Sequence, residues 1–253
     1  MRTILKITGA AALLLSISAC APSASQLKSV LEEHPEILTG AIEKHPEQFM
    51  EALQKASEAA QAKAEAAKME ELFKNPLNPE VIEARGFLGD AKAPLTIVEY
   101  TDFQCPYCSK GYETLEEVRK AYGDKVRVLV KNLPLPMHPQ AMPAAQYFEA
   151  LRLQDPAKAY AFYHEVFANQ DGLNKDKEKF LDAAATKAGG NLAQLKKDIK
   201  GPKVKEAIAA DMKEAESFEI QGTPGFVVGG IPLRGAYPLP FFKQIIDRRL
   251  ANK

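Results

Sequence analysis

The sequence predicts an α/β domain preceded by an all-helical N-terminal arm. Residues 95–100 form an apolar run of β-branched and aromatic side chains, which is typical of a buried strand, and residues 126–131 form a second such run. A long helical pattern over about 137–218 separates these strands from a predicted hairpin at 225–234. A last helix follows at 239–250. Strands that alternate with helices in this way place the domain in the α/β class.

A pair of cysteines lies where the first strand gives way to a helix, in the sequence Cys105-Pro106-Tyr107-Cys108. Pro106 suits the first helical turn, because the N–H group that proline lacks would have no partner there. Cys105 therefore lies at the helix N-terminus, where the partial positive charge and the free N–H groups favour a thiolate. Cys108 is one turn away, close enough to form a disulfide. The arrangement indicates redox chemistry.

A zinc site and a purely structural disulfide are the alternative interpretations of this pair. Zinc usually takes four ligands, commonly from a second pair of cysteines or histidines at similar spacing. A disulfide across so short a loop removes little entropy from the unfolded chain. We therefore favour the redox interpretation and expect neither a metal nor a cofactor. The other cysteine is Cys20, and the histidines are scattered without metal-motif spacing at His34, His45, His138 and His164.

Residues 1–19 have the features of a secretory signal of the lipoprotein type. Arg2 and Lys6 make the start basic, and the apolar stretch behind them is too short for a stable membrane span. Small residues then lead to Cys20, which resembles the acylated cysteine of a bacterial lipobox. Ala21 in the next position favours the outer membrane over the inner one. The alternative is an ordinary signal peptide that is cut nearby.

Export would place the protein in the periplasm or cell envelope, where oxidising conditions let Cys105 and Cys108 rest as a disulfide. The sequence has no other long apolar stretch, so we expect lipid attachment to be its link to the membrane. Its 33 basic and 33 acidic residues balance. Such a chain has no general electrostatic attraction for nucleic acid, which we exclude as a partner.

Residues 20–75 form the predicted arm. A His-Pro-Glu sequence occurs twice, and each proline ends one helix and suits the first turn of the next. This predicts short helices near 25–33 and 35–44 and a longer helix from residue 46. Apolar residues at three- and four-residue steps form a stripe on helices that have no core of their own. Further copies of the arm are the simplest partners, in a dimer or trimer. The alternatives are a flexible spacer and an arm folded back on its own domain.

After a predicted linker at 76–79, the domain at 80–253 resembles the thioredoxin fold with the helical insertion of the DsbA family. The motifs are Gly89 to Tyr100, then Cys105-Pro106-Tyr107-Cys108, and Gly222-Thr223-Pro224-Gly225-Phe226. A Cys-x-x-Cys motif by itself is weak evidence for this family. The same motif directly after such a strand, followed about 115 residues later by Thr-Pro and an apolar hairpin, is strong evidence for it.

The resemblance implies roles for the residues of these motifs. Cys105 would be the nucleophile and Cys108 the resolving thiol, and the two residues between them would complete the redox motif. Pro224 would be a cis-proline opposite the cysteines, which only proline adopts at modest cost. Thr223 would then pair through its backbone with an extended client segment, as an added strand does.

Glu99 matches the buried acid that lies beneath the disulfide in this family. A buried carboxylate can pass a proton to or from Cys108. We expect Lys131, on the neighbouring strand, to be the ion-pair partner of Glu99. The alternative is that both are surface residues of their strands.

The relatives of strongest oxidising power carry a histidine between their cysteines where this chain has Tyr107, so we expect a weaker oxidant. The Pro-Tyr pair, the Thr-Pro motif and the arm look more like DsbG, the suppressor-of-copper-sensitivity (ScsC) proteins and, less closely, the Com1-type surface antigens. The expected protein is an oligomeric disulfide isomerase with some oxidase activity. Exported cysteine-containing proteins would be its clients, and a membrane redox partner would reset the pair. The alternatives are an oxidase with the arm as a spacer and, in another class, a copper-binding or scaffold lipoprotein.

Overall fold

The computed structural model describes residues 23–251, so the predicted signal segment and Cys20 lie outside the described residues. The chain divides into two compact units between Glu65 and Ala66. Within the described part, no helix combines the length and the apolar character needed to span a bilayer.

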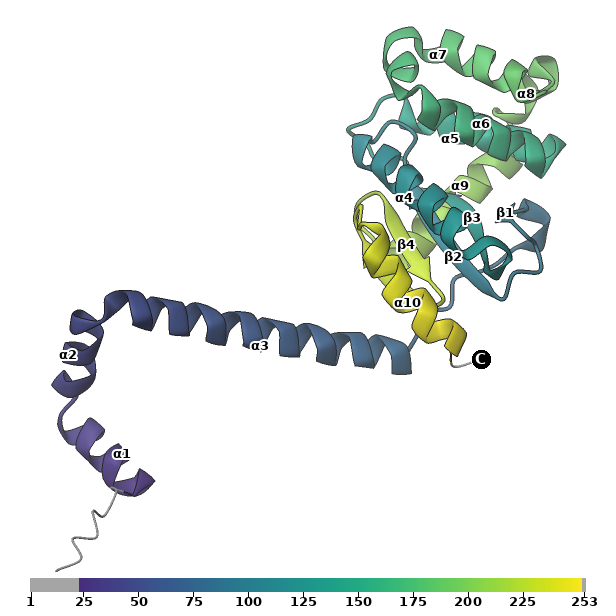
Figure 1. The fold of residues 1–253 in the computed structure, drawn as a ribbon. Helices are drawn as coiled ribbons and strands as arrows, with labels where there is room; N and C mark the ends of the chain where they lie inside the picture. Colours follow the sequence, from purple (N-terminus) through teal and green to yellow (C-terminus); the bar gives the residue numbers. More distant parts are fainter. Residues whose placement is uncertain (1–22, 252–253) are drawn as a thin grey trace, which may run out of the picture. The chain divides into compact units, whose positions relative to one another are not determined.

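The first unit is the helical arm (Figure 1). It contains α1 (Ala24–Glu33), α2 (Glu36–Lys44) and most of α3 (Pro46–Lys74), as the repeated His-Pro-Glu sequence predicts. A capping box starts α1, because the Ser23 hydroxyl accepts from the Gln26 N–H and the Gln26 side chain accepts from the Ser23 N–H. None of the residues of α1 and α2, all of which are described, is buried.

The last turns of α3 belong to the second unit. Met69, Leu72 and Phe73 pack against its hydrophobic core. Glu70 accepts two hydrogen bonds from the Arg248 guanidinium, at 2.6 and 2.7 Å. The same guanidinium lies 3.8 Å from the centre of the Phe73 ring. The globular unit therefore starts inside α3, earlier than the predicted linker.

The second unit is built on a five-stranded sheet with the strand order β1-β3-β2-β4-β5. β2 and β3 are parallel, and the other neighbouring pairs are antiparallel. Four of the strands match those predicted, whereas β1 is too short to leave a pattern in the sequence. The strands are β1 (Leu88–Gly89), β2 (Leu95–Thr101), β3 (Val126–Asn132), β4 (Gly225–Val228) and β5 (Ile231–Arg234).

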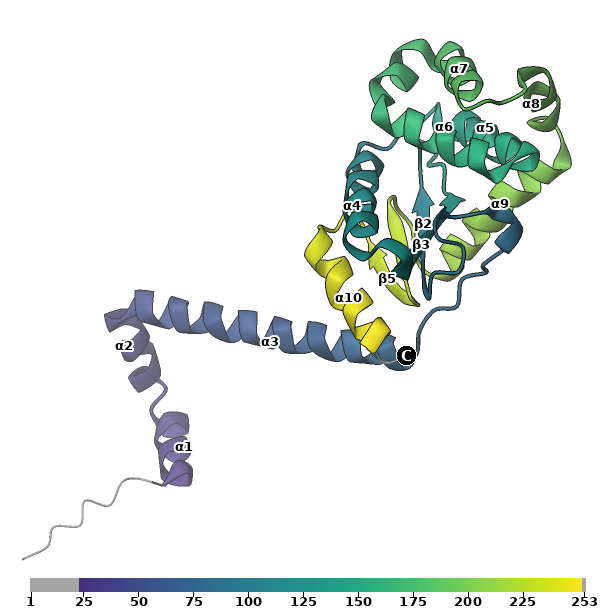
Figure 2. The same cartoon turned by 45° about the vertical axis from the view of Figure 1, so that its right-hand side comes forward.

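Helices cover both faces of the sheet (Figures 1 and 2). α4 and α10 pack against one another on one face, and α9 contacts β3 from the other. The predicted insertion between β3 and β4 contributes α5 to α9, and α5 to α7 gather beyond the C-terminal ends of β2 and β3. The helices are α4 (Pro106–Tyr122), α5 (Ala141–Gln154), α6 (Pro156–Ala168), α7 (Gln170–Lys187), α8 (Leu192–Asp198), α9 (Pro202–Ser217) and α10 (Leu239–Ala251), with short turns η1 (Glu83–Arg85) and η2 (Gly123–Lys125).

Local capping sets the breaks within the insertion. Asp155 accepts a hydrogen bond from the Ala157 N–H, and Pro156 occupies the first turn of α6. The next break falls at Asn169. The Asn169 side chain caps α7 by accepting from the Gly172 N–H.

Side chains of the sheet alternate between two hydrophobic clusters. Ile97 and Val128 belong to the cluster that contains α4, α10 and the insertion, whereas Val98 and Leu129 belong to the cluster that contains residues of α9. This is the two-residue period of a strand buried on both faces. The aromatic side chains of α5 and α6 lie in the first cluster, with Tyr147, Phe148, Tyr160, Phe162, Tyr163 and Phe167 all buried.

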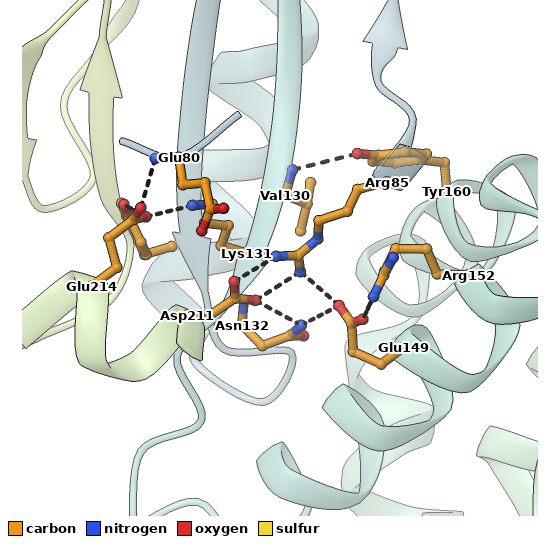
Figure 3. A network of polar contacts seen from close by, with 11 residues as sticks. Glu80, Arg85, Val130, Lys131, Asn132, Glu149, Arg152, Tyr160, Asp211 and Glu214 are labelled. Atoms are coloured by element: carbon orange, nitrogen blue, oxygen red, sulfur yellow. Dashed lines mark hydrogen bonds and ion pairs between the residues drawn. The ribbon is translucent and has the colours of Figure 1, made fainter. Parts of the chain in front are cut away.

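A buried ionic network joins the insertion to the sheet (Figure 3). The Arg85 guanidinium donates to both Asp211 oxygens, at 2.5 and 2.7 Å, and to Glu149 at 2.7 Å. Asn132, at the end of β3, donates its backbone N–H to Asp211 and its side chain to Glu149. Arg152 pairs with the second oxygen of Glu149. One buried guanidinium therefore connects η1, α5 and α9.

Replacing Arg85 by methionine should lower the free energy of unfolding by about 3–5 kcal/mol, because it leaves two buried carboxylates short of their cation. Urea denaturation measures the loss. Lys187→Met is the matched control, since the Lys187 side chain is 70% exposed in its ion pair with Glu165 and should matter by less than about 1 kcal/mol. Equal stability of the two variants would contradict a stabilising role of the network.

Candidate active site

The cysteine pair lies at the junction of β2 and α4. Cys105 is the N-cap residue of α4, with extended backbone angles, and Pro106 occupies the first turn. The buried Asp102 carboxylate shapes the junction, because it accepts hydrogen bonds from the backbone N–H groups of Gln104 and Leu135, at 2.8 and 2.9 Å. The Asp102 backbone N–H itself points to the Cys108 sulfur, 3.4 Å away. The turn thus places both thiols at the positive end of the helix.

The two cysteines form no disulfide in this structure, and their pKa values are shifted in opposite directions. The Cys108 thiol donates a hydrogen bond to the Cys105 sulfur, and with backbone N–H groups of α4 this lowers the pKa of Cys105 to about 5. Burial raises the pKa of Cys108 well above that of an ordinary thiol, and the neighbouring Cys105 charge adds to the effect. At neutral pH Cys105 is therefore a thiolate and Cys108 a thiol. This is the division of a nucleophile and a resolving group.

The peptide bond between Thr223 and Pro224 is cis, as the resemblance implies. The Thr223 carbonyl oxygen lies 3.5 Å from the Cys105 sulfur. A Cβ atom on Gly111 of α4 would lie 3.0 Å from the Pro224 ring and 3.1 Å from Phe226, so only glycine lets the helix approach the loop this closely. The two segments that bracket the nucleophile are thereby held together.

The residues between the cysteines face outward. Pro106 and Tyr107 are exposed, Tyr107 by 60%, and the Lys110 ammonium lies 5.6 Å from the centre of the Tyr107 ring. An apolar ring beside a reactive thiolate offers contact area to a polypeptide that approaches the site.

Glu99 lies in β2, six residues before Cys105, and is completely buried. Its carboxylate accepts a hydrogen bond from the Tyr163 hydroxyl at 2.7 Å. Desolvation raises the pKa of Glu99 to about 7, although the Tyr163 hydrogen bond opposes the rise. A carboxyl group with this pKa can both take and return a proton near neutral pH.

The predicted ion pair between Lys131 and Glu99 is wrong. Glu99 is in register with Val130, and Lys131 with Tyr100. Because successive side chains point to opposite faces, Lys131 lies on the α9 side of the sheet. There it pairs with Glu214 at 2.5 Å, and the Tyr100 hydroxyl donates to the same carboxylate (Figure 3). Lys131 is therefore not part of a relay with Glu99.

Several residues at the site carry no sequence signal of their own. Gln170, at the start of α7, donates its side-chain amide to the carbonyl oxygens of Phe103 and Cys105, at 3.0 and 2.8 Å. His138 binds the buried oxygen of Asp102 at 2.7 Å. The insertion thus holds the redox turn from outside the sheet. Asp102 could have been noticed from its place three residues before Cys105, but a glutamine 65 positions further on could not.

No group of three or more histidine, cysteine or acidic residues in the described part of the chain is placed to hold a metal ion. What the site offers is one ionised thiol, one neutral thiol, a buried proton acceptor and an open backbone carbonyl. These groups suffice for thiol–disulfide exchange.

Comparison with known proteins agrees with this geometry. The family model described as thioredoxin matches residues 82–248, most of the globular unit. The chain belongs to the thioredoxin family. Within the family, a thioredoxin-like oxidoreductase from Silicibacter pomeroyi DSS-3 has 26% sequence identity and a TM-score of 0.56, over 65% of this chain and 91% of that one.

Two further solved structures share the fold. Proteus mirabilis ScsC in a transitional conformation is 23% identical, with a TM-score of 0.56 over 93% of this chain and 100% of that one. The thiol-disulfide exchange protein alpha-DsbA2 from Wolbachia pipientis is 18% identical, with a TM-score of 0.56 over 64% and 85% of the two chains. These two structures confirm the fold that the resemblance implies.

The curated proteins that are similar to this chain in sequence are named as antiporters. The chain is 34% identical over 166 residues to the Na(+)/H(+) antiporter NhaA 1 of Mycolicibacterium gilvum (strain PYR-GCK), over 64% of this chain and 25% of that protein. A similar match to the Na(+)/H(+) antiporter NhaA 3 of Salinispora tropica, at 32% identity, covers 70% and 26%. The chain spans about a quarter of the length of these relatives.

Replacing Cys108 by alanine should raise the pKa of Cys105, because the hydrogen bond from the Cys108 thiol is the largest cause of its acidity. A hydrogen bond to a charged group corresponds to a shift of about one to two pH units. The pH dependence of alkylation by iodoacetamide, or of thiolate absorbance, measures it. Ser109→Ala is the control. An unchanged midpoint in Cys108→Ala would assign the acidity to the Thr223 side chain and the backbone N–H groups of α4.

Glu99 should make stability depend on pH. Its pKa is about 7 in the folded protein and 4.5 ordinarily, so the folded state binds more protons between these values and loses stability as pH rises through this window. The loss should be about 3 kcal/mol between pH 4 and pH 8 relative to Glu99→Gln. Urea unfolding of both proteins with the disulfide formed, so that no thiol titrates, measures it. If the free energies of unfolding of the two proteins depended on pH in the same way, Glu99 would not titrate as a buried carboxyl group.

Proposed function

We propose that the protein is a thiol–disulfide oxidoreductase of the periplasm or cell envelope that acts on the cysteines of exported proteins. The observation that carries this proposal is the asymmetry of the pair: an acidic Cys105 at the helix N-cap, beside a buried Cys108 and the Thr223 carbonyl. Neither a zinc site nor a structural disulfide needs such an asymmetry.

The geometry supports exchange in the oxidising direction. A client thiolate attacks the Cys105 sulfur of the Cys105–Cys108 disulfide, the mixed disulfide forms, and Cys108 leaves with the electron pair and takes up a proton. A second client thiolate attacks the client sulfur, which forms the client disulfide and releases Cys105. Cys105 leaves readily because its pKa is low. The client is oxidised and the pair reduced, and a membrane redox partner would reset it.

The reduced pair supports isomerisation. The Cys105 thiolate attacks a wrong client disulfide, holds one client sulfur in a mixed disulfide, and frees the other to attack elsewhere in the client. If no correct disulfide forms, Cys108 attacks Cys105 and releases the client thiol. Thr223 would hold the client through its backbone, next to the attacking sulfur.

The arm favours an isomerase. Its large apolar side chains are 36–61% exposed, and such a surface is expected to be covered by a partner. Copies of the same arm would bring several active sites to one client and raise the local concentration of thiols around it. The side chains of this stripe are Leu27, Val30, Leu31, Ile37, Leu38, Phe49, Met50 and Leu53.

Cys20 would carry the lipid that anchors the assembly to the membrane, with the outer membrane favoured by Ala21. A second candidate is a dithiol oxidase in which the arm serves only as a spacer. The low pKa of Cys105 supports it, since a stabilised thiolate makes the disulfide form a stronger oxidant.

The stripe can be tested without removing the arm. In a chain that starts at residue 21, Leu27→Glu combined with Leu38→Glu should give a monomer that unscrambles a multi-disulfide substrate about tenfold more slowly and still oxidises a dithiol peptide. Sedimentation velocity and the two assays measure this. Lys28→Glu with Thr39→Glu adds acidic groups to the same helices at polar positions, and should keep the oligomer and both activities.

The outcomes separate the candidates. Unscrambling that survives in a monomer would remove the arm from the mechanism. Oxidation without unscrambling in the unmodified chain would favour the oxidase. A chain inactive in both assays would not be a thiol–disulfide oxidoreductase of these clients.

A further inference from the structure

The helical insertion places a hydroxyl group at the buried side of the redox site. Tyr163 of α6 is completely buried and donates to the Glu99 carboxylate at 2.7 Å. Its ring centre lies 6.2 Å from that of Phe103 and 5.5 Å from that of Tyr112, two residues that bracket the cysteine pair along the chain. The Tyr163 ring therefore packs against residues on both sides of the cysteine pair in the sequence, and its hydroxyl is close enough to Cys108 for the thiol charge to raise the pKa of Tyr163.

Packing alone does not require this hydroxyl. The rings in contact with Tyr163 are those of Phe103, Phe167, Tyr112 and His164, and a phenyl ring at position 163 would fill the same space. A buried hydroxyl costs free energy unless it is hydrogen-bonded, so its presence here is accounted for by the bond to Glu99.

Two hydroxyl groups favour the ionised form of Glu99: that of Tyr163, which has the larger effect on the pKa of Glu99, and that of Thr101 in the same strand. In the sheet the register partners of Glu99 are Val130 of β3 and Phe226 of β4, both apolar. The titratable groups that act on Tyr163 are Glu99 itself and, from α4, Cys108 and Tyr112. No cation among the described residues pairs with Glu99, since Lys131 lies on the other face of the sheet.

We propose that Tyr163 is a positioning residue that holds Glu99 in its ionised form, ready to take the proton of Cys108 when the mixed disulfide is resolved. The inference rests on the proposed function and deepens it. It assigns a part of the chemistry to the insertion, which the sequence indicates only as hydrophobic core.

The step that Tyr163 supports is the attack of Cys108. The Cys108 proton moves to the Glu99 carboxylate, and the Cys108 sulfur attacks the Cys105 sulfur with the freed electron pair. A Cys105–Cys108 bond forms, the bond between Cys105 and the client sulfur breaks, and the client sulfur leaves as a thiolate that is protonated by water. The pair is oxidised and the client reduced. If Glu99 is already protonated, the transfer cannot start.

Tyr163→Phe should shift the acid limb of the pH–rate profile for this step to higher pH. Loss of the hydrogen bond to the charged form should raise the midpoint by about one pH unit and, from a starting pKa of about 7, slow release at pH 7 about fivefold. The full chain is prepared as a mixed disulfide between Cys105 and thionitrobenzoate, and release of the coloured thiol is followed in single turnover from pH 5 to pH 9. The iodoacetamide titration of Cys105 in the free protein should not move.

Tyr147→Phe is the matched control. Tyr147 is another buried ring of the insertion whose hydroxyl donates to a carboxylate, that of Asp182, at 2.6 Å. This variant loses an equivalent hydrogen bond away from the cysteines and should keep the pH profile of the unmodified protein.

A second readout does not depend on exchange. The carboxyl carbon of Glu99 is followed by NMR in protein labelled at glutamate, with Glu99→Gln identifying the signal. A higher titration midpoint in Tyr163→Phe supports the inference, and an equal midpoint overturns it, even if release is slower. If the unmodified protein releases no thiol at any pH, the proposed function fails, while the NMR midpoint still decides whether Tyr163 controls Glu99.

Discussion

The redox site depends on the exclusion of water from the carboxyl end of β2. Glu99 and Cys108 are fully buried there, under aromatic rings of the insertion and against α4. Desolvation disfavours the charged form of both groups, so the Cys108 thiol stays protonated and the carboxyl pKa rises toward neutrality. Desolvation raises the pKa of Cys105 as well, but the hydrogen bond from the Cys108 thiol, together with Thr223 and backbone N–H groups, outweighs it. The different roles of two chemically identical residues thus follow from their different hydrogen-bonding positions within one helical turn.

The insertion has to be held in place for this exclusion to work, and it is held by polar groups as well as by packing. Gln170 binds the backbone of the redox turn, and the Arg85 network joins α5 and α9 to the end of β3. Buried ion pairs that are also hydrogen-bonded have a defined geometry, and replacing one residue of a pair leaves the other without its partner. A helix that shifted would lose defined hydrogen bonds, whereas one held only by apolar contacts could slide.

The arm differs from the globular unit in what stabilises it. Its two short helices bury no residue, and its apolar stripe is large for a surface that faces only water. The globular unit, by contrast, secures the end of α3 with Phe73 packed against its core and a double hydrogen bond between Glu70 and Arg248. The chain thus combines a unit that is stable by its own core with a segment whose stability is expected to come from partners.

The sequence by itself determined what depends on near neighbours along the chain: the proline-set helices of the arm, the strands, the insertion, and the placement of Cys105 at a helix start. With the family resemblance it also predicted the cis bond before Pro224. Only the tertiary structure decided which distant groups meet. In the parallel pairing of β2 and β3, Lys131 is in register with Tyr100 and not with Glu99, so its side chain lies on the other face of the sheet and pairs with Glu214. Tyr163, 64 positions further along the chain, contacts Glu99 instead. Register and helix packing are properties of the whole core, and a pattern of residue types along the chain does not contain them.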